Sequence, residues 1–159
     1  MTIKREAGYH EACHATLAER SRFHRLVGAI NLAEYGQGET YVSLSKQKLV
    51  AAGKPPTAAA AQDPEVARDL ALILVAGYVG EQIAATLDNS IVPNLDCAAP
   101  DHELARQQLS AAGLPEDFSS FEIEARCLLE AEWPRVRLVA DYLLQNVRAQ
   151  PDDILPMLV

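Results

Sequence analysis

The chain has few basic residues, few cysteines and no long apolar run. Its 159 residues include 14 Lys and Arg against 22 Asp and Glu, which gives a formal net charge of −8. Because nucleic acids and anionic membrane surfaces attract positively charged protein surfaces, this balance argues against either as a partner. With 49% hydrophobic and 23% charged residues, the composition is that of a globular protein, and the length predicts a single domain over residues 1–159.

The three cysteines are an odd number, and no two of them form a CxxC pair. Their scarcity favours reduced thiols in a reducing compartment over a disulfide framework. The amino-terminal sequence MTIKREAGYHEACH lacks the apolar stretch of a secretory signal. The most apolar run, Leu70 to Gly80, is too short to span a bilayer and indicates a core helix. We therefore predict a cytoplasmic protein.

Helical patterns dominate the chain. Apolar spacing and end signals predict four helices, at about residues 3–20, 63–87, 101–112 and 118–146. The second opens with Asp63-Pro64, an N-cap followed by a proline at the first helical position, and the third ends at Gly113. The fourth contains Pro134, where it either kinks or restarts. Residues 151–159 indicate a last short turn or helix.

Two short segments rich in Val, Ile, Thr and Tyr predict a small amount of β structure. Residues 25–32 and 39–44 flank the sequence AEYGQG, whose glycines can adopt positive φ, and this arrangement indicates a β-hairpin. Residues 45–64 are biased toward Ala, Pro and Lys and predict a mobile surface loop with one helical turn at its start. The expected fold class is mainly α (α+β), with one small β-hairpin or sheet and a C-terminal helical bundle.

The first predicted helix contains HEACH, two histidines four residues apart with a glutamate after the first. Residues four apart lie on one helix face, so His10 and His14 can converge on one metal ion. Glu11 would lie beside the ion, where it can accept a proton from a zinc-bound water and pass it to a leaving amine. This is the HExxH arrangement of zinc proteases. An ordinary helix that carries polar side chains is the alternative.

A catalytic zinc site usually has three protein ligands and an open position for water, so a third ligand must come from elsewhere in the chain. Spacing alone does not choose among the candidates. These are Glu81, Asp96, Cys97, Asp101, His102 and Glu103.

The order of these segments resembles the peptidase domain of the FtsH-type zinc proteases. HEACHA at residues 10–15 matches that family's HEAGHA helix except at Cys13, and LVGAINLAEYGQGETYVSL resembles its hairpin. AGYVGEQIA at residues 76–84 resembles a helix with a Gly-Gly-Arg-x-Ala-Glu-Glu pattern. PDHELARQQL resembles the Asn-Asp-hydrophobic-x-x-Ala stretch, which opens a helix and supplies the family's third zinc ligand. With the closing helices resembled by IEARCLLEAEWPRVRLVADYLLQ, the resemblance covers nearly the whole chain.

The resemblance implies a zinc-dependent endopeptidase that hydrolyses peptide bonds through a metal-activated water. It implies His10, His14 and Asp101 as zinc ligands and Glu11 as the general base. We expect Glu81 either to orient a liganding histidine or to lie in solvent or in a salt bridge between helices.

Three positions depart from the family patterns. Cys13 replaces a glycine, where it adds volume and can provide an oxidation-sensitive thiolate near the metal. Pro100 replaces an asparagine, and His102 replaces an apolar residue. Outside these motifs we expect His24 and His102 at the surface, Cys97 and Cys127 as small buried residues, and Trp133 in the core.

The sequence contains no P-loop, so we expect its substrates to be peptides, flexible segments or proteins that a separate ATPase partner unfolds. The sequence also leaves open whether the protein forms a homo-oligomer. The alternative function is an inactive or weak peptidase-fold module that binds or regulates a partner. A third interpretation is an acidic helical domain without a metal.

Overall fold

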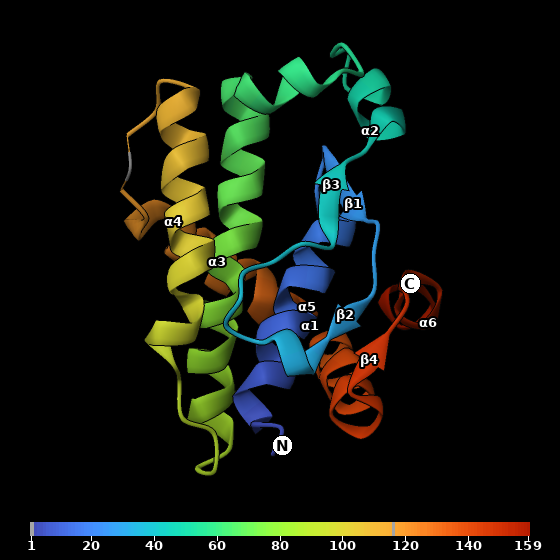
Figure 1. The fold of residues 1–159 in the computed structure, drawn as a ribbon, viewed down its shortest axis with the longest axis vertical. Coiled ribbons are helices and arrows are strands. Elements are labelled where there is room, and N and C mark those ends of the chain that lie inside the picture. Colours follow the sequence, from blue (N-terminus) through green and yellow to red (C-terminus); the bar gives the residue numbers. More distant parts are fainter. Residues whose placement is uncertain (1, 116) are drawn as a thin grey trace.

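Four long helices form most of the computed structural model, which describes residues 2–115 and 117–159 (Figure 1). The helices α1 (Arg5–Arg20), α3 (Pro64–Leu87) and α5 (Ser119–Asn146) pack against one another, and α4 (Leu95–Ala111) packs against α3. Helices account for 68% of the structure and strands for 6%. The mainly α class is therefore confirmed.

The start of α3 follows the local sequence. The Asp63 carboxylate accepts the N–H of Glu65 at 2.9 Å, and Pro64 occupies the first turn, where its missing N–H leaves no bond unmade. The predicted N-cap is confirmed.

The start of α4 differs from the prediction. Asn94 caps the helix by accepting the N–H of Cys97, so α4 begins at Leu95, well before the expected start at Asp101. Pro100 is accommodated inside the helix, at the cost of the one backbone hydrogen bond that its missing N–H would donate. Asp101 is consequently an interior residue of α4 and not its N-cap.

The carboxyl-terminal ends of α4 and α5 are set by residues with positive φ. After α4, Gly113 has φ +74° and donates to Ser110, while Leu114 donates to Leu109; these paired bonds are a Schellman motif and confirm the predicted stop. The helix α5 continues through Pro134 to Val147, whose φ is +67°. No new helix starts at Pro134.

The β structure is divided between two small antiparallel sheets. Strand β1 (His24–Leu26) pairs with β3 (Val42–Leu44), and β2 (Ile30–Asn31) pairs with β4 (Arg148–Ala149). The predicted hairpin therefore exists only at its outer ends, and the prediction that residues 25–32 form one of its strands is wrong. The physical reason is a competing partner, since the backbone after α5 bonds β2 and the following residue, Leu32.

Short helices fill the remaining connections. The segment expected to be a mobile loop contains α2 (Lys46–Ala51) and the 3-10 helix η2 (Ala58–Gln62). It contributes Leu49 and Ala60 to a small second core with Phe23 and Val66. The other short elements are η1 (Leu32–Glu34), α6 (Pro151–Ile154) and η3 (Leu155–Leu158).

The apolar run of residues 70–80 lies in α3, at the centre of the main core. With 24 residues, α3 is long and apolar enough to cross a membrane, which corrects the length argument made from the run alone. However, 61% of its most apolar window is buried inside the protein. Its residues pack against α1, α4 and α5, as in a core helix.

Candidate metal centre

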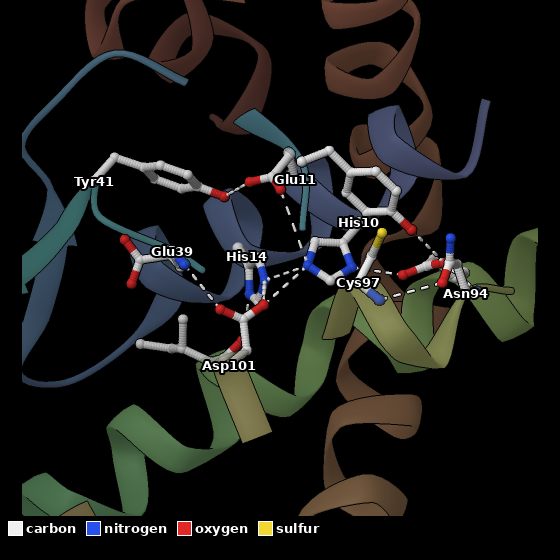
Figure 2. A network of polar contacts seen from close by, with 11 residues as sticks. His10, Glu11, His14, Glu39, Tyr41, Asn94, Cys97 and Asp101 are labelled. Atoms are coloured by element: carbon white, nitrogen blue, oxygen red, sulfur yellow. Dashed lines mark hydrogen bonds and ion pairs between the residues drawn. The ribbon is translucent and has the colours of Figure 1, made fainter. Parts of the chain in front are cut away.

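Three predicted ligands meet in the interior of the protein, between α1 and α4 (Figure 2). His10 and His14 lie one turn apart on α1, and their Nε2 atoms are 3.0 Å apart. One oxygen of Asp101, Oδ2, lies 3.0 Å from the first of these nitrogens and 3.1 Å from the second. All three residues are at most 2% exposed. The tertiary structure thus brings together residues that are 91 positions apart.

The hydrogen bonds on the far side of each imidazole determine which ring nitrogen carries hydrogen. His14 Nδ1 lies 2.7 Å from the carbonyl oxygen of Ile73, which can only accept. His10 Nδ1 lies 2.6 Å from Glu81, whose other oxygen already accepts two hydrogen bonds. Both Nδ1 atoms therefore donate, and in the neutral rings both Nε2 atoms direct lone pairs at each other and at a carboxylate oxygen. Such a cluster of acceptors requires a cation or additional protons.

The pKa values of His10, His14 and Asp101 also indicate that the site needs positive charge. Burial lowers the pKa of both imidazoles, but hydrogen bonds to Asp101 and Glu81 outweigh burial and raise the pKa of His10 to about 10. The charge of Asp101 likewise raises the pKa of His14. Burial acts to raise the pKa of Asp101, yet His14 and His10 hold it well below its usual range. The centre favours positive charge between the three side chains.

The donor set fits a divalent metal ion. In a tetrahedral zinc site with bonds of about 2.0–2.1 Å, ligand atoms lie roughly 3.3 Å apart, so the observed separations need to widen by only a few tenths of an ångström. Among the His, Cys, Asp and Glu side chains of residues 2–115 and 117–159, these three bring their ligand atoms within 4.8 Å of one another. His10, His14 and Asp101 could therefore hold a metal ion.

Glu81 holds the ring of His10, one of the three candidate ligands, from outside that group. It is fully buried, and its carboxylate accepts from His10 Nδ1, from the Tyr35 hydroxyl at 2.9 Å and from the Asn94 N–H at 2.8 Å. The predicted alternative of a solvated position is wrong, whereas the contact with His10 joins α1 to α3 and is an ion pair between helices when the ring is protonated. A carboxylate on the second ring nitrogen fixes the tautomer and raises the basicity of the metal-binding nitrogen.

Glu11 lies beside the ligand atoms, as the HExxH pattern predicts. Its Oε1 atom is 3.9 Å from His10 Nε2, and its Oε2 atom accepts a hydrogen bond from the hydroxyl of Tyr41. The Glu11 side chain is 10% exposed, whereas those of the three ligands are 2% or less. Of these four side chains, Glu11 is thus the most accessible to solvent.

The remaining ligand candidates lie outside this group. Asp96 and Glu103 are exposed. Cys97 is half-buried with its sulfur against Gly36, and His102 packs between the rings of Tyr78 and Phe118.

Three expectations about burial are corrected by the structure. His24 is 3% exposed and bonded to Asp69, so its predicted surface position is wrong. Cys127 is exposed on α5, and Cys97 is only half-buried. Trp133 is half-buried, where it stacks on Tyr9 and packs against the main core.

Two glycines of α3 make room for α1. A Cβ atom at Gly77 would lie 2.6 Å from the Nε2 atoms of both His10 and His14, and one at Gly80 would lie 2.2 Å from the sulfur of Cys13. Cys13 is fully buried, and burial raises the pKa of its thiol well above the ordinary value. The Cys13 side chain therefore fills the space that Gly80 leaves, and its burial disfavours the thiolate form.

Sequence reasoning missed Gly77 and two tyrosines that contact the site, Tyr35 and Tyr41. A glycine inside an apolar helix is a signal of close approach, and it was present in the sequence. The tyrosines flank the glycine-containing segment before β3, but no pattern in the sequence indicates which side chains their hydroxyls reach.

A comparison of the chain with protein-family models, with curated proteins and with solved structures finds no match.

Proposed function

We propose that this protein is a zinc-dependent endopeptidase of the FtsH type, with His10, His14 and Asp101 as ligands and Glu11 as the general base. The observation that carries the proposal is the convergence of two bare Nε2 atoms and one carboxylate oxygen, with the carboxylate of Glu11 beside them. Structural zinc sites usually have four protein ligands, whereas catalytic sites have three and an open position. The three-ligand set favours catalysis.

Each side chain has a defined task in this proposal. When bound, zinc supplies Lewis acidity, which lowers the pKa of water from about 15.7 to about 7 and polarises a carbonyl group. Glu11 accepts the proton of the attacking water and delivers it to the leaving amine. Glu81 holds His10 through Nδ1, and the Ile73 carbonyl holds His14 in the same way. Both rings are thereby kept in the tautomer that leaves Nε2 free for the metal.

The β structure next to the site offers a place for an extended substrate. Within the described residues, β3 pairs with β1 alone, and the Val42 N–H on its other edge donates to the Glu39 carboxylate, so a peptide strand that pairs along this edge would replace that bond. We propose flexible segments, small peptides or proteins unfolded by a separate ATPase as substrates, in the cytoplasm.

The decisive experiment replaces Glu11 by Gln and measures zinc content and cleavage of a disordered test protein. We expect Glu11→Gln to keep about one zinc per chain and to lose cleavage by roughly a hundredfold or more, since general-base catalysis contributes about 10²–10⁴-fold. Glu103→Gln is the matched control, because Glu103 is an exposed carboxylate on α4 two residues from Asp101. Cleavage that survives in Glu11→Gln would contradict the proposal.

A second candidate, a metal-binding module without turnover, is favoured by the burial of the site. Because the three ligands are at most 2% exposed, substrate must displace part of the surrounding chain to reach them. This candidate predicts stoichiometric zinc, no cleavage of any unfolded protein, and a specific protein partner recovered in a pull-down.

A further inference from the structure

One short segment contacts every carboxylate of the candidate metal centre. The segment runs from Tyr35 to Tyr41 and connects η1 with β3. The Tyr35 hydroxyl donates to Glu81, the backbone N–H of Glu39 donates to Asp101 at 2.8 Å, and the Tyr41 hydroxyl donates to Glu11. The segment thus supplies one donor to the ligand carboxylate, one to the base and one to the carboxylate behind His10.

The backbone of this segment reaches the site because two of its residues are glycines. Gly36 and Gly38 have φ values of +91° and +93°, a region in which other residues are strained. A Cβ atom at Gly36 would lie 2.9 Å from the sulfur of Cys97, and one at Gly38 would lie 3.3 Å from Pro100. The segment therefore lies directly against the first turns of α4, which carries Asp101.

The two oxygens of Glu11 face different partners. Oε2 is held by Tyr41, and Oε1 is directed to the side of His10 Nε2, at 3.9 Å (Figure 2). Tyr41 is only 5% exposed, and burial with the charge of Glu11 raises the pKa of its phenol well above the ordinary value, so the hydroxyl remains a donor. The Tyr41 bond thus limits rotation of the Glu11 carboxylate and keeps one oxygen toward the ligand atoms.

Tyr35 acts on a different group. Its hydroxyl bonds the Glu81 oxygen that does not contact His10, and its ring lies edge-on to the His10 imidazole with centroids 5.3 Å apart. Glu81 has no Lys or Arg partner among the described ion pairs, so Tyr35 and Asn94 supply the donors that hold its second oxygen. The chain Tyr35–Glu81–His10 orients a ligand ring through two hydrogen bonds.

We propose that Tyr35 and Tyr41 are positioning residues with separate tasks: Tyr41 orients the Glu11 carboxylate, and Tyr35 orients His10 through Glu81. The first task rests on the proposed function, whereas the second concerns metal binding and is independent of turnover. Loss of each hydroxyl therefore has its own signature.

Tyr35→Phe tests the ligand-orienting task. We expect zinc to bind about 10- to 100-fold more weakly in competition with a chromophoric chelator, which is the usual effect of losing a partner behind a liganding histidine. In a Glu81→Gln background the same substitution should add little, because its effect passes through Glu81. Tyr142→Phe is the control, a half-buried tyrosine of α5 whose hydroxyl has no hydrogen bond among the described residues.

Tyr41→Phe tests the base-orienting task. We expect zinc affinity within about twofold of the parent and kcat reduced roughly 10- to 100-fold at unchanged KM, with no further loss in a Glu11→Gln background. The readout that needs no turnover is a crystal structure of the zinc-loaded variant, in which the Glu11 carboxylate should leave its present orientation. Urea unfolding of zinc-loaded samples identifies any general loss of stability.

The outcomes separate this inference from the proposed function. If the parent protein binds zinc but cleaves nothing, the peptidase proposal fails, while the affinity of Tyr35→Phe and the Glu11 position in Tyr41→Phe still decide the two tasks. The assignment would be overturned if zinc affinity and kcat changed equally in Tyr35→Phe and Tyr41→Phe. It would also be overturned if Tyr35→Phe bound zinc as tightly as Tyr142→Phe. An unmoved Glu11 carboxylate in Tyr41→Phe would overturn it as well.

Discussion

The contact between Cys13 and Gly80 gives the sharpest test of how α1 and α3 pack next to the candidate metal centre. A methyl group at position 80 would lie 2.2 Å from Cys13 Sγ and 2.9 Å from Cys13 Cβ, whereas carbon atoms in ordinary contact are about 3.5–4.0 Å apart. Rotation of the thiol can relieve the first contact but not the second. Gly80→Ala therefore forces the two helices apart.

Two opposing effects determine how much Gly80→Ala changes the free energy of unfolding. Overpacking a core costs about 1–3 kcal/mol and occasionally more, and two contacts under 3.0 Å place this site at or above the upper end. Replacing a helical glycine by alanine returns about 1 kcal/mol of helix propensity. We expect Gly80→Ala to lower the free energy of unfolding by roughly 2 kcal/mol, and Cys13→Gly to lower it by a similar amount through lost burial and propensity.

The double variant should recover much of this loss because, without the Cys13 side chain, the new methyl group meets Tyr9 O at 3.5 Å, which is an ordinary contact. We expect a favourable coupling energy of about 2 kcal/mol or more in a double-mutant cycle.

The assay is urea unfolding of the zinc-free protein, followed by circular dichroism, with m-values checked for constancy. Gly8→Ala combined with Cys13→Gly is the control cycle, since a Cβ atom at Gly8 would meet Leu144 of α5 and not Cys13; additivity within about 0.5 kcal/mol is expected there. The same additivity in the Cys13–Gly80 cycle would refute the packing argument.

Three further predictions concern the metal. Gly77→Ala places a methyl group 2.6 Å from both Nε2 atoms; we expect it to lose stoichiometric zinc while keeping its helical circular dichroism, and normal zinc content would contradict the clearance argument. In the metal-free fold the pKa of His10 is raised to about 10, so the protonated ring stabilises the folded state. This part of the free energy of unfolding is lost as pH rises through about 10. Zinc must displace that proton, so its affinity should rise roughly tenfold per pH unit for each proton released between pH 6.5 and 8.5. A flat profile by chelator competition would refute this. Finally, zinc at about 1,000 times its Kd should raise the free energy of unfolding by roughly 4 kcal/mol, and a chelator should reverse the gain; an unchanged urea midpoint would argue against a folded-state site.

Local signals in the sequence predicted the helices well because helix ends depend on neighbouring residues. Asp63-Pro64 and Gly113 supply caps through bonds that span a few positions. One failure came where two local signals competed, and another where a distant segment supplied the strand partner. The sequence predicted a helix from about Asp101, but the Asn94 cap starts α4 earlier. It also predicted one strand at residues 25–32, although the chain after α5 pairs with their second half.

The sequence by itself determined that His10 and His14 share one helix face with Glu11 beside them, because helical periodicity fixes the relation of residues four apart. Only the tertiary structure decided that Asp101 joins them, that Glu81 stands behind His10, and that Tyr35 and Tyr41 reach the carboxylates of the site. These contacts join residues 30 to 91 positions apart. They depend on how closely α1, α3 and α4 approach, which is set by the volumes of side chains such as Cys13 and by the absence of side chains at Gly77 and Gly80.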